Sequence, residues 1–318
     1  MSTTLYYLSF AYSRMRKYII TIELHFLLLV FVLLLQVNSL AFPQPAIKDS
    51  ASASTREEAV AMLNKITEIA ASEYWPNIQP DLFLENLKRN IAQPLTIYEG
   101  SYLNFCGYAA LSYIPLHYDP VGYVKFILEL YSRGKSQYGN VLIHPSKEVM
   151  AAAGTIKFKG ILDINHADQM WFLSLADHFK GYLNWTNSKY NTGDERTFWA
   201  AVNFAKFNRM VSTLFNYQVQ STGSDVIRPK MDNVYSYLKK QLETGITFLY
   251  VDNYILTLKK HHFLRPSFPT HFIVLLDINY VDGLFNITYW DYGFRTFIKV
   301  TPAFLKKIIF GISHCTKA

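Results

Sequence analysis

A cysteine, a histidine and an aspartate stand in three short motifs that together could carry nucleophilic chemistry. Cys106 lies in Asn104-Phe105-Cys106-Gly107, at the start of a small, apolar stretch over 106–117 that predicts a buried helix. A helix N-terminus offers oriented N–H groups and partial positive charge, which lower a thiol pKa and stabilise an oxyanion. We therefore expect Cys106 to be a low-pKa nucleophile. The alternative is that Cys106 is simply a small residue of the core, as free cysteines usually are.

The base and the group that orients it are expected on strands. His271 opens the run 270–277, whose Ile, Val and Leu residues predict a strand. Asp291 follows the next predicted strand, 285–290, directly before a turn at Gly293. Two neighbouring antiparallel strands can bring His271 and Asp291 together. A thiol, a base and a carboxylate that orients the base form the cysteine version of the acyl-transfer triad.

The three motifs, in the order Cys106, His271 and Asp291, resemble those of the papain-like clan of cysteine peptidases, and most of all its peptidase C39-like branch. The interval from cysteine to histidine is 165 residues, against about 130–150 in papain, and the excess fits an inserted helical segment over about 167–215. The resemblance implies a papain-like α+β fold without a cofactor. It also implies hydrolysis of an amide bond in a peptide or protein substrate through a thioester. Related transglutaminases and deamidases share that intermediate, so a toxin-like acyl-transfer enzyme remains an alternative.

One position departs from the papain-like pattern. Such enzymes usually carry an oxyanion-hole glutamine about six residues before the nucleophile, and here that position is Gly100. Asn104 or Gln93 could substitute for it, or the backbone N–H of Cys106 could act with another donor. Because losing one such donor costs about 10² to 10³ in rate, the third reading is an inactive homologue, a noncatalytic exported binding protein.

The remaining metal-binding and thiol side chains favour structural roles. His166, Asp168 and His178 lie near one another in sequence but lack a third ligand at metal spacing, so we expect no metal site. Cys315 is the second of only two cysteines and stands near the end of the sequence. We expect it to be a free thiol; a disulfide with Cys106 would instead silence the nucleophile.

Hydrophobic periodicity predicts helices in the first two-thirds of the chain and short strands in the last third, which is an α+β plan. Asp119, Pro120 and Gly134 match the start and stop signals of one helix, and Asp282-Gly283 predicts a hairpin. The predicted helices are one that starts at 55 and is ended by Trp75-Pro76, and others over 81–91, 106–117, 120–133, 145–153, 167–183, 195–215 and 231–242; the predicted strands cover 246–251, 271–279, 285–290 and 296–300.

The N-terminal segment predicts export. A basic cluster at 14–17 precedes the apolar stretch 19–35, and Ser39-Leu40-Ala41 is a small-x-small cleavage site. These features predict a signal peptide over 1–41, with residues 1–14 a start-site artefact if translation begins at Met15. The protein would then be secreted or periplasmic; an uncleaved membrane anchor is the alternative. We expect a flexible tether over 42–54 and a catalytic domain over 55–318.

Composition narrows the class of partner. The chain has 318 residues, of which 50% are hydrophobic and 17% charged, so it is not a disordered protein. Its net charge is +7, but its basic residues form no dense stripe. We therefore expect no nucleic-acid partner, and contact with a membrane only through the N-terminal segment if that segment is retained.

Overall fold

Helices make up the first part of the described chain. The computed structural model describes residues 54–318 except 101, 157–163, 254–255, 257–266 and 292. The elements that precede the large sheet are α2 (Arg56–Asn64), α3 (Pro80–Ala92), η1 (Pro94–Thr96), α4 (Cys106–Tyr118), α5 (Pro120–Arg133), the hairpin strands β1 (Ser136–Tyr138) and β2 (Val141–Ile143), α6 (Lys147–Ala152), α7 (His166–His178), η2 (Asp194–Arg196) and α8 (Phe204–Phe215).

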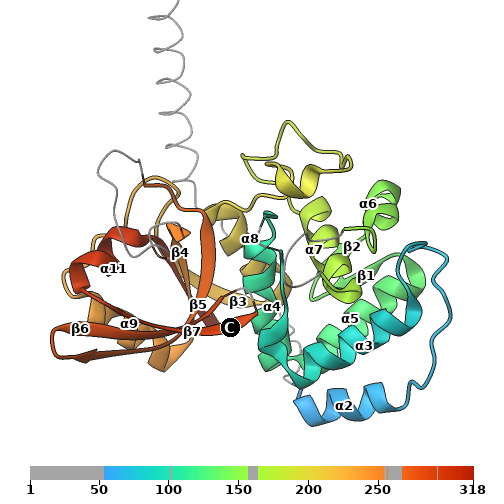
Figure 1. Cartoon of the computed structure of the whole chain (residues 1–318), viewed down its shortest axis with the longest axis horizontal. Helices are drawn as coiled ribbons and strands as arrows, with labels where there is room; N and C mark the ends of the chain where they lie inside the picture. The colour runs from blue at the N-terminus through green and yellow to red at the C-terminus, as the bar shows by residue number, and fades with distance from the viewer. Residues whose placement is uncertain (1–53, 101, 157–163, 254–255, 257–266, 292) are drawn as a thin grey trace, which may run out of the picture. The chain divides into compact units, whose positions relative to one another are not determined.

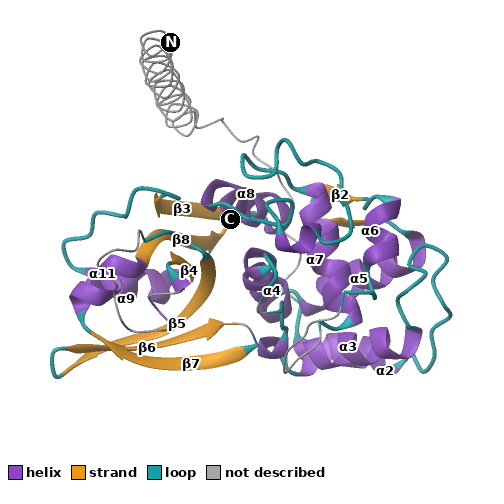
Figure 2. Ribbon diagram, turned by 45° about the horizontal axis from the view of Figure 1, so that its top comes forward, coloured by secondary structure: helices purple, strands orange, loops and turns teal. Residues whose placement is uncertain are grey.

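The last part of the chain, coloured from yellow to red in Figure 1, forms a six-stranded antiparallel sheet with the strand order β3-β8-β4-β5-β6-β7, and Figure 2 labels these strands. Helices α9 (Val234–Thr244) and α11 (Pro302–Ile308) lie between strands in the sequence. The strands are β3 (Tyr217–Gly223), β4 (Ile246–Val251), β5 (His271–Val281), β6 (Leu284–Asp291), β7 (Phe294–Val300) and β8 (Ile309–Lys317). The predicted α+β class is confirmed.

The two faces of this sheet border two hydrophobic cores. Along β4, Phe248 and Tyr250 belong to the large core shared with α4, α7 and α8, whereas Leu249 and Val251 belong to a smaller core with α9 and α11. This is the alternation expected of a strand covered on both faces. Helix α4 packs against β5 (Figure 2). The arrangement brings the beginning of α4 next to the beginning of β5.

Several local signals are confirmed. The Asp119 side chain accepts a hydrogen bond from the Gly122 N–H, Pro120 is the first residue of α5, and Gly134 ends this helix with φ +68°. At the β5–β6 hairpin, Val281 pairs with Leu284, and both turn residues have positive φ. A positive φ at both central positions is the type I′ geometry that an Asp-Gly pair favours.

Other predicted boundaries are wrong. The helix predicted over 195–215 begins at Phe204, because the buried Glu195 accepts hydrogen bonds from the Tyr190 hydroxyl and the Gly193 N–H and so stabilises an irregular loop. The helix predicted over 167–183 ends at His178, and the one from 55 ends at Asn64. Strands β3 and β8 and helix α11 were not predicted.

The segment 167–215, expected to be an insertion, contains α7 and α8, and both pack directly on α4. It therefore contributes to the core beneath Cys106. Outside the described residues lie the predicted signal peptide and all of the tether except Ser54, whose hydroxyl binds the Asp119 carboxylate at 2.7 Å. Among the helices that the structure describes, none is both long and apolar enough to cross a membrane.

Candidate active site

Cys106 is the first residue of α4, and the segment before it is fixed by backbone contacts. The Asn104 N–H donates to the Glu195 carbonyl at 2.9 Å, and the Asn104 side-chain amide donates to the Thr197 carbonyl at 2.8 Å. The Phe105 ring stacks on Phe172 of α7 with 5.3 Å between centroids. These contacts hold the turn that presents the cysteine at the helix N-terminus.

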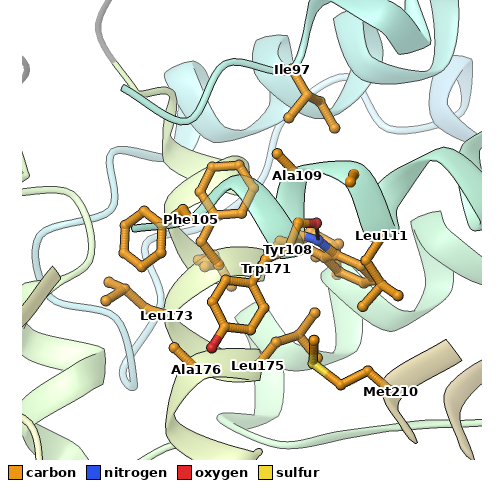
Figure 3. Close-up of a cluster of buried hydrophobic side chains, with 14 of the residues drawn as sticks. Ile97, Phe105, Tyr108, Ala109, Leu111, Trp171, Leu173, Leu175, Ala176 and Met210 are labelled. Atoms are coloured by element: carbon orange, nitrogen blue, oxygen red, sulfur yellow. Dashed lines mark hydrogen bonds between the residues drawn. The ribbon is translucent and has the colours of Figure 1, made fainter. Parts of the chain in front are cut away.

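The first turn of α4 is also anchored from below. The Trp171 indole N–H donates to the Tyr108 carbonyl at 2.9 Å, and Figure 3 shows these two side chains among the buried residues that join α4 to α7. The Lys206 Nζ atom donates to the Tyr108 hydroxyl at 2.7 Å and to the Ala201 carbonyl at 3.0 Å. Burial lowers the pKa of Lys206 to about 6. Cys106 therefore stands at the start of a helix that is anchored to α7 and α8.

Gly107 has a packing role that the sequence did not indicate. A Cβ atom at this position would lie 2.8 Å from the Val202 Cβ, closer than carbon atoms pack. The glycine is thus required because the loop before α8 presses against the first turn of α4.

The Cys106 sulfur lies against the beginning of β5. The thiol donates to the Thr270 carbonyl, with 3.8 Å between sulfur and oxygen, and the sulfur accepts the backbone N–H of Phe272. These two peptide groups flank His271. Because backbone N–H and C=O groups point along the plane of a sheet, the thiol meets the edge of the strand rather than one face. Side-chain alternation along β5 therefore does not separate it from His271.

His271 and Asp291 form the tightest polar contact of the site. The His271 Nε2 atom lies 2.5 Å from the Asp291 Oδ1 atom, and the histidine is 1% exposed. A carboxylate can only accept from a neutral imidazole, so this contact favours the tautomer with its proton on Nε2. Proton exchange with a thiol then falls to Nδ1. The expected pairing of His271 with Asp291 is confirmed, and the thiol lies beside the same residue.

The expectation of a low-pKa thiol is wrong. Burial is the largest cause that raises the pKa of Cys106, and the Glu99 carboxyl group acts in the same direction when it is ionised. The N–H groups of Phe272 and Gly107 act in the opposite direction but are outweighed. The helix N-terminus thus does not by itself generate a thiolate. Cys106 is a thiol at neutral pH and needs a base to remove its proton.

Glu99 is the site residue that sequence reasoning missed. It is 1% exposed and lies seven residues before Cys106; it interacts electrostatically with the thiol, and the Asp291 carboxylate raises the pKa of Glu99. The two predicted oxyanion donors are engaged or lie elsewhere: the Asn104 amide binds Thr197, and Gln93 is exposed at the end of α3. The only available signal was that Glu99 adjoins the position where papain-like enzymes have glutamine.

The other candidate side chains have structural surroundings. The Cys315 thiol is free and fully buried in β8, so it is not part of a mobile tail. His166 accepts the Gln79 N–H at the start of α7, Asp168 binds two buried asparagines, and His178 contacts the Phe179 ring. The described residues contain no cluster of His, Cys, Asp and Glu side chains arranged to hold a metal ion.

Comparison with known proteins yields no assignment: the chain matches no protein-family model, and no curated protein sequence matches it.

Proposed function

We propose that this chain is an exported cysteine hydrolase that cleaves amide bonds in peptides or proteins through Cys106, His271 and Asp291, on a papain-like fold. One observation carries the proposal: the Cys106 thiol contacts the peptide groups on both sides of His271, whose imidazole is hydrogen-bonded to Asp291. This arrangement combines a nucleophile, a base and an orienting carboxylate.

The chemistry follows from the raised thiol pKa. The Cys106 sulfur attacks the substrate carbonyl carbon as its proton passes to His271 Nδ1, and the carbonyl π electrons move onto oxygen. The C–N bond then breaks, the amine leaves with the proton from His271, and a thioester remains. Water attacks the thioester with His271 as base, the C–S bond breaks, and the carboxylic acid leaves. Asp291 stabilises the imidazolium that forms in each half of the cycle.

Casein digestion in the presence of a primary amine tests the proposal and separates it from its alternatives. We expect new peptide ends from the wild type and from Cys315→Ala, and none from Cys106→Ala, as measured by mass spectrometry. Conversion of glutamine to glutamate would indicate a deamidase, and incorporation of the amine a transglutaminase. Products that persist in Cys106→Ala would refute the proposal. If neither protein gives a product, the binding-protein alternative is favoured.

A further inference from the structure

The segment before Cys106 contacts residues on both sides of Asp291. The Trp290 indole N–H donates to the Leu95 carbonyl at 2.8 Å. Gly293, with φ +81°, approaches so closely that a Cβ atom there would lie 3.1 Å from the Ile97 carbonyl oxygen. The chain therefore runs from the β6–β7 turn towards the nucleophile, and Glu99 lies on this path.

The Glu99 carboxyl group is buried but incompletely bonded. Its Oε1 atom has no hydrogen-bond partner among the residues that the structure describes. Buried polar atoms of this kind are rare, because an unmade hydrogen bond costs about 1–3 kcal/mol. Such an atom near Cys106 could form a hydrogen bond with a bound ligand.

The backbone explains why a glutamate at 99 could replace a glutamine at 100. Gly100 has φ +83°, a conformation that L-residues other than glycine rarely adopt. A Cβ atom there would also lie 3.1 Å from the Leu103 side chain. A glutamine at position 100 would be strained on both counts. The preceding residue, Glu99, carries a long polar side chain at this turn.

The groups around Glu99 decide its protonation state. Cys106 of α4 and Asp291 of β6 both interact with it, and Asp291 is in turn bound to His271 of β5. Burial raises the pKa of Glu99 well above its ordinary value, and the Asp291 carboxylate adds to that shift. Glu99 therefore retains its proton under conditions that ionise an exposed glutamate, and it can donate a hydrogen bond.

We propose that Glu99, as a neutral carboxylic acid, donates a hydrogen bond to the oxyanion that forms when Cys106 attacks a carbonyl group. This inference rests on the proposed function. The O–H bond of Glu99 stays intact, and the second donor is the backbone N–H of Cys106, which has no intrahelical partner at the first position of α4. Ionised Glu99 would repel the oxyanion and oppose thiol ionisation, so carbonyl addition weakens as pH rises through the Glu99 titration.

The test compares a reaction that forms an oxyanion with one that does not, in a Cys315→Ala background. A trifluoromethyl ketone made from N-acetylglycine adds to the thiol and creates an oxyanion-like oxygen, whereas iodoacetamide alkylates the same sulfur by displacement. Glu99→Met removes the donor, and Glu99→Gln retains a neutral donor at every pH. Ketone affinity is measured by protection of Cys106 from iodoacetamide at pH 6 and pH 9, and thermal unfolding checks that each variant is folded.

We expect Glu99→Met to weaken ketone binding at pH 6 by about 10²-fold. The rate of alkylation at pH 6 should change less than about threefold, which is well below the tenfold change that corresponds to about 1.4 kcal/mol. Relative to the parent protein, Glu99→Gln should bind the ketone more tightly at pH 9 than at pH 6, because only the parent loses its donor as pH rises. Parent-like ketone binding by Glu99→Met would overturn the role of Glu99 alone. If the parent protein is alkylated at Cys106 but does not bind the ketone, the proposed function itself fails and the inference with it.

Discussion

Two buried carboxyl groups in this protein, Asp168 and Glu99, have contrasting surroundings. Both are 1% exposed, and burial raises the pKa of each, that of Asp168 to about 6. Asp168 accepts hydrogen bonds from the side-chain amides of Asn90 at 2.7 Å and Asn86 at 3.3 Å. Glu99 has an oxygen without a partner among the described residues, and its charged neighbour is another carboxylate.

The difference separates a structural polar group from a functional one. Asp168 joins α3 to α7, and Asn86 also accepts the N–H groups of Ala167 and Asp168 at the start of α7. Asp168, Asn86 and Asn90 each have a protein partner, so their hydrogen bonds stabilise the packing of α3 against α7. Glu99 lacks such a partner for one oxygen, and it lies close enough to Cys106 and Asp291 to interact with them electrostatically. A site tolerates an unsatisfied group when a ligand completes it.

The largest expected effect comes from breaking the satisfied cluster. Asp168→Ala removes one acceptor from each of two buried amides and leaves a cavity, although Asn86 still donates to Asn90 and Asn90 to Tyr123. We expect a loss of about 3 kcal/mol in the free energy of unfolding. Urea denaturation measures this value. The control is Arg133→Ala, which removes an exposed ion pair with Glu129 and should cost less than about 1 kcal/mol. If Asp168→Ala unfolds at the same urea concentration as the wild type, the cluster does not stabilise the packing of the two helices.

Substitution of Glu99, the carboxyl group with an unpartnered oxygen, is expected to have a smaller effect, and it should stabilise the protein rather than destabilise it. A carboxyl whose pKa is raised on folding binds more protons in the folded state, so stability falls as pH rises above the unfolded value of about 4.5. Glu99→Gln removes this titration. We therefore expect its melting temperature to exceed that of the wild type at pH 8, with a smaller gap at pH 5. A gap that is absent or that narrows with rising pH would show that Glu99 has an ordinary pKa in the folded protein.

Local signals predicted more of the fold than of the site. The helix from Pro120 to Arg133 and the hairpin at Asp282-Gly283 follow from capping and turn residues, which act within a few positions of the chain. Strand β8 was missed because Gly311, Ser313 and His314 interrupt its apolar pattern. It is nevertheless a central strand between β3 and β4, where tertiary burial overrides the low strand propensity of such residues.

The pairing of His271 with Asp291 was predictable because each residue lies at the end of a recognisable strand. The surroundings of Glu99 and Gly107 were not predictable, because they depend on residues distant in sequence: Glu99 interacts electrostatically with Asp291, and Gly107 packs against Val202. The thiol pKa was predicted in the wrong direction for the same reason. Helix position is visible in a sequence, whereas burial and a neighbouring carboxylate are not.

The rate of alkylation of Cys106 by iodoacetamide, followed against pH in Cys315→Ala with and without His271→Ala, tests the central claim most directly. Because the thiol pKa is raised, the account predicts that His271 supplies the base near neutrality. His271→Ala should therefore slow alkylation about tenfold between pH 6 and 8, a difference of about 1.4 kcal/mol in barrier, and the two rates should converge at high pH. Equal rates in both proteins from pH 6 to 8 would contradict the assignment of His271 as the base that activates Cys106.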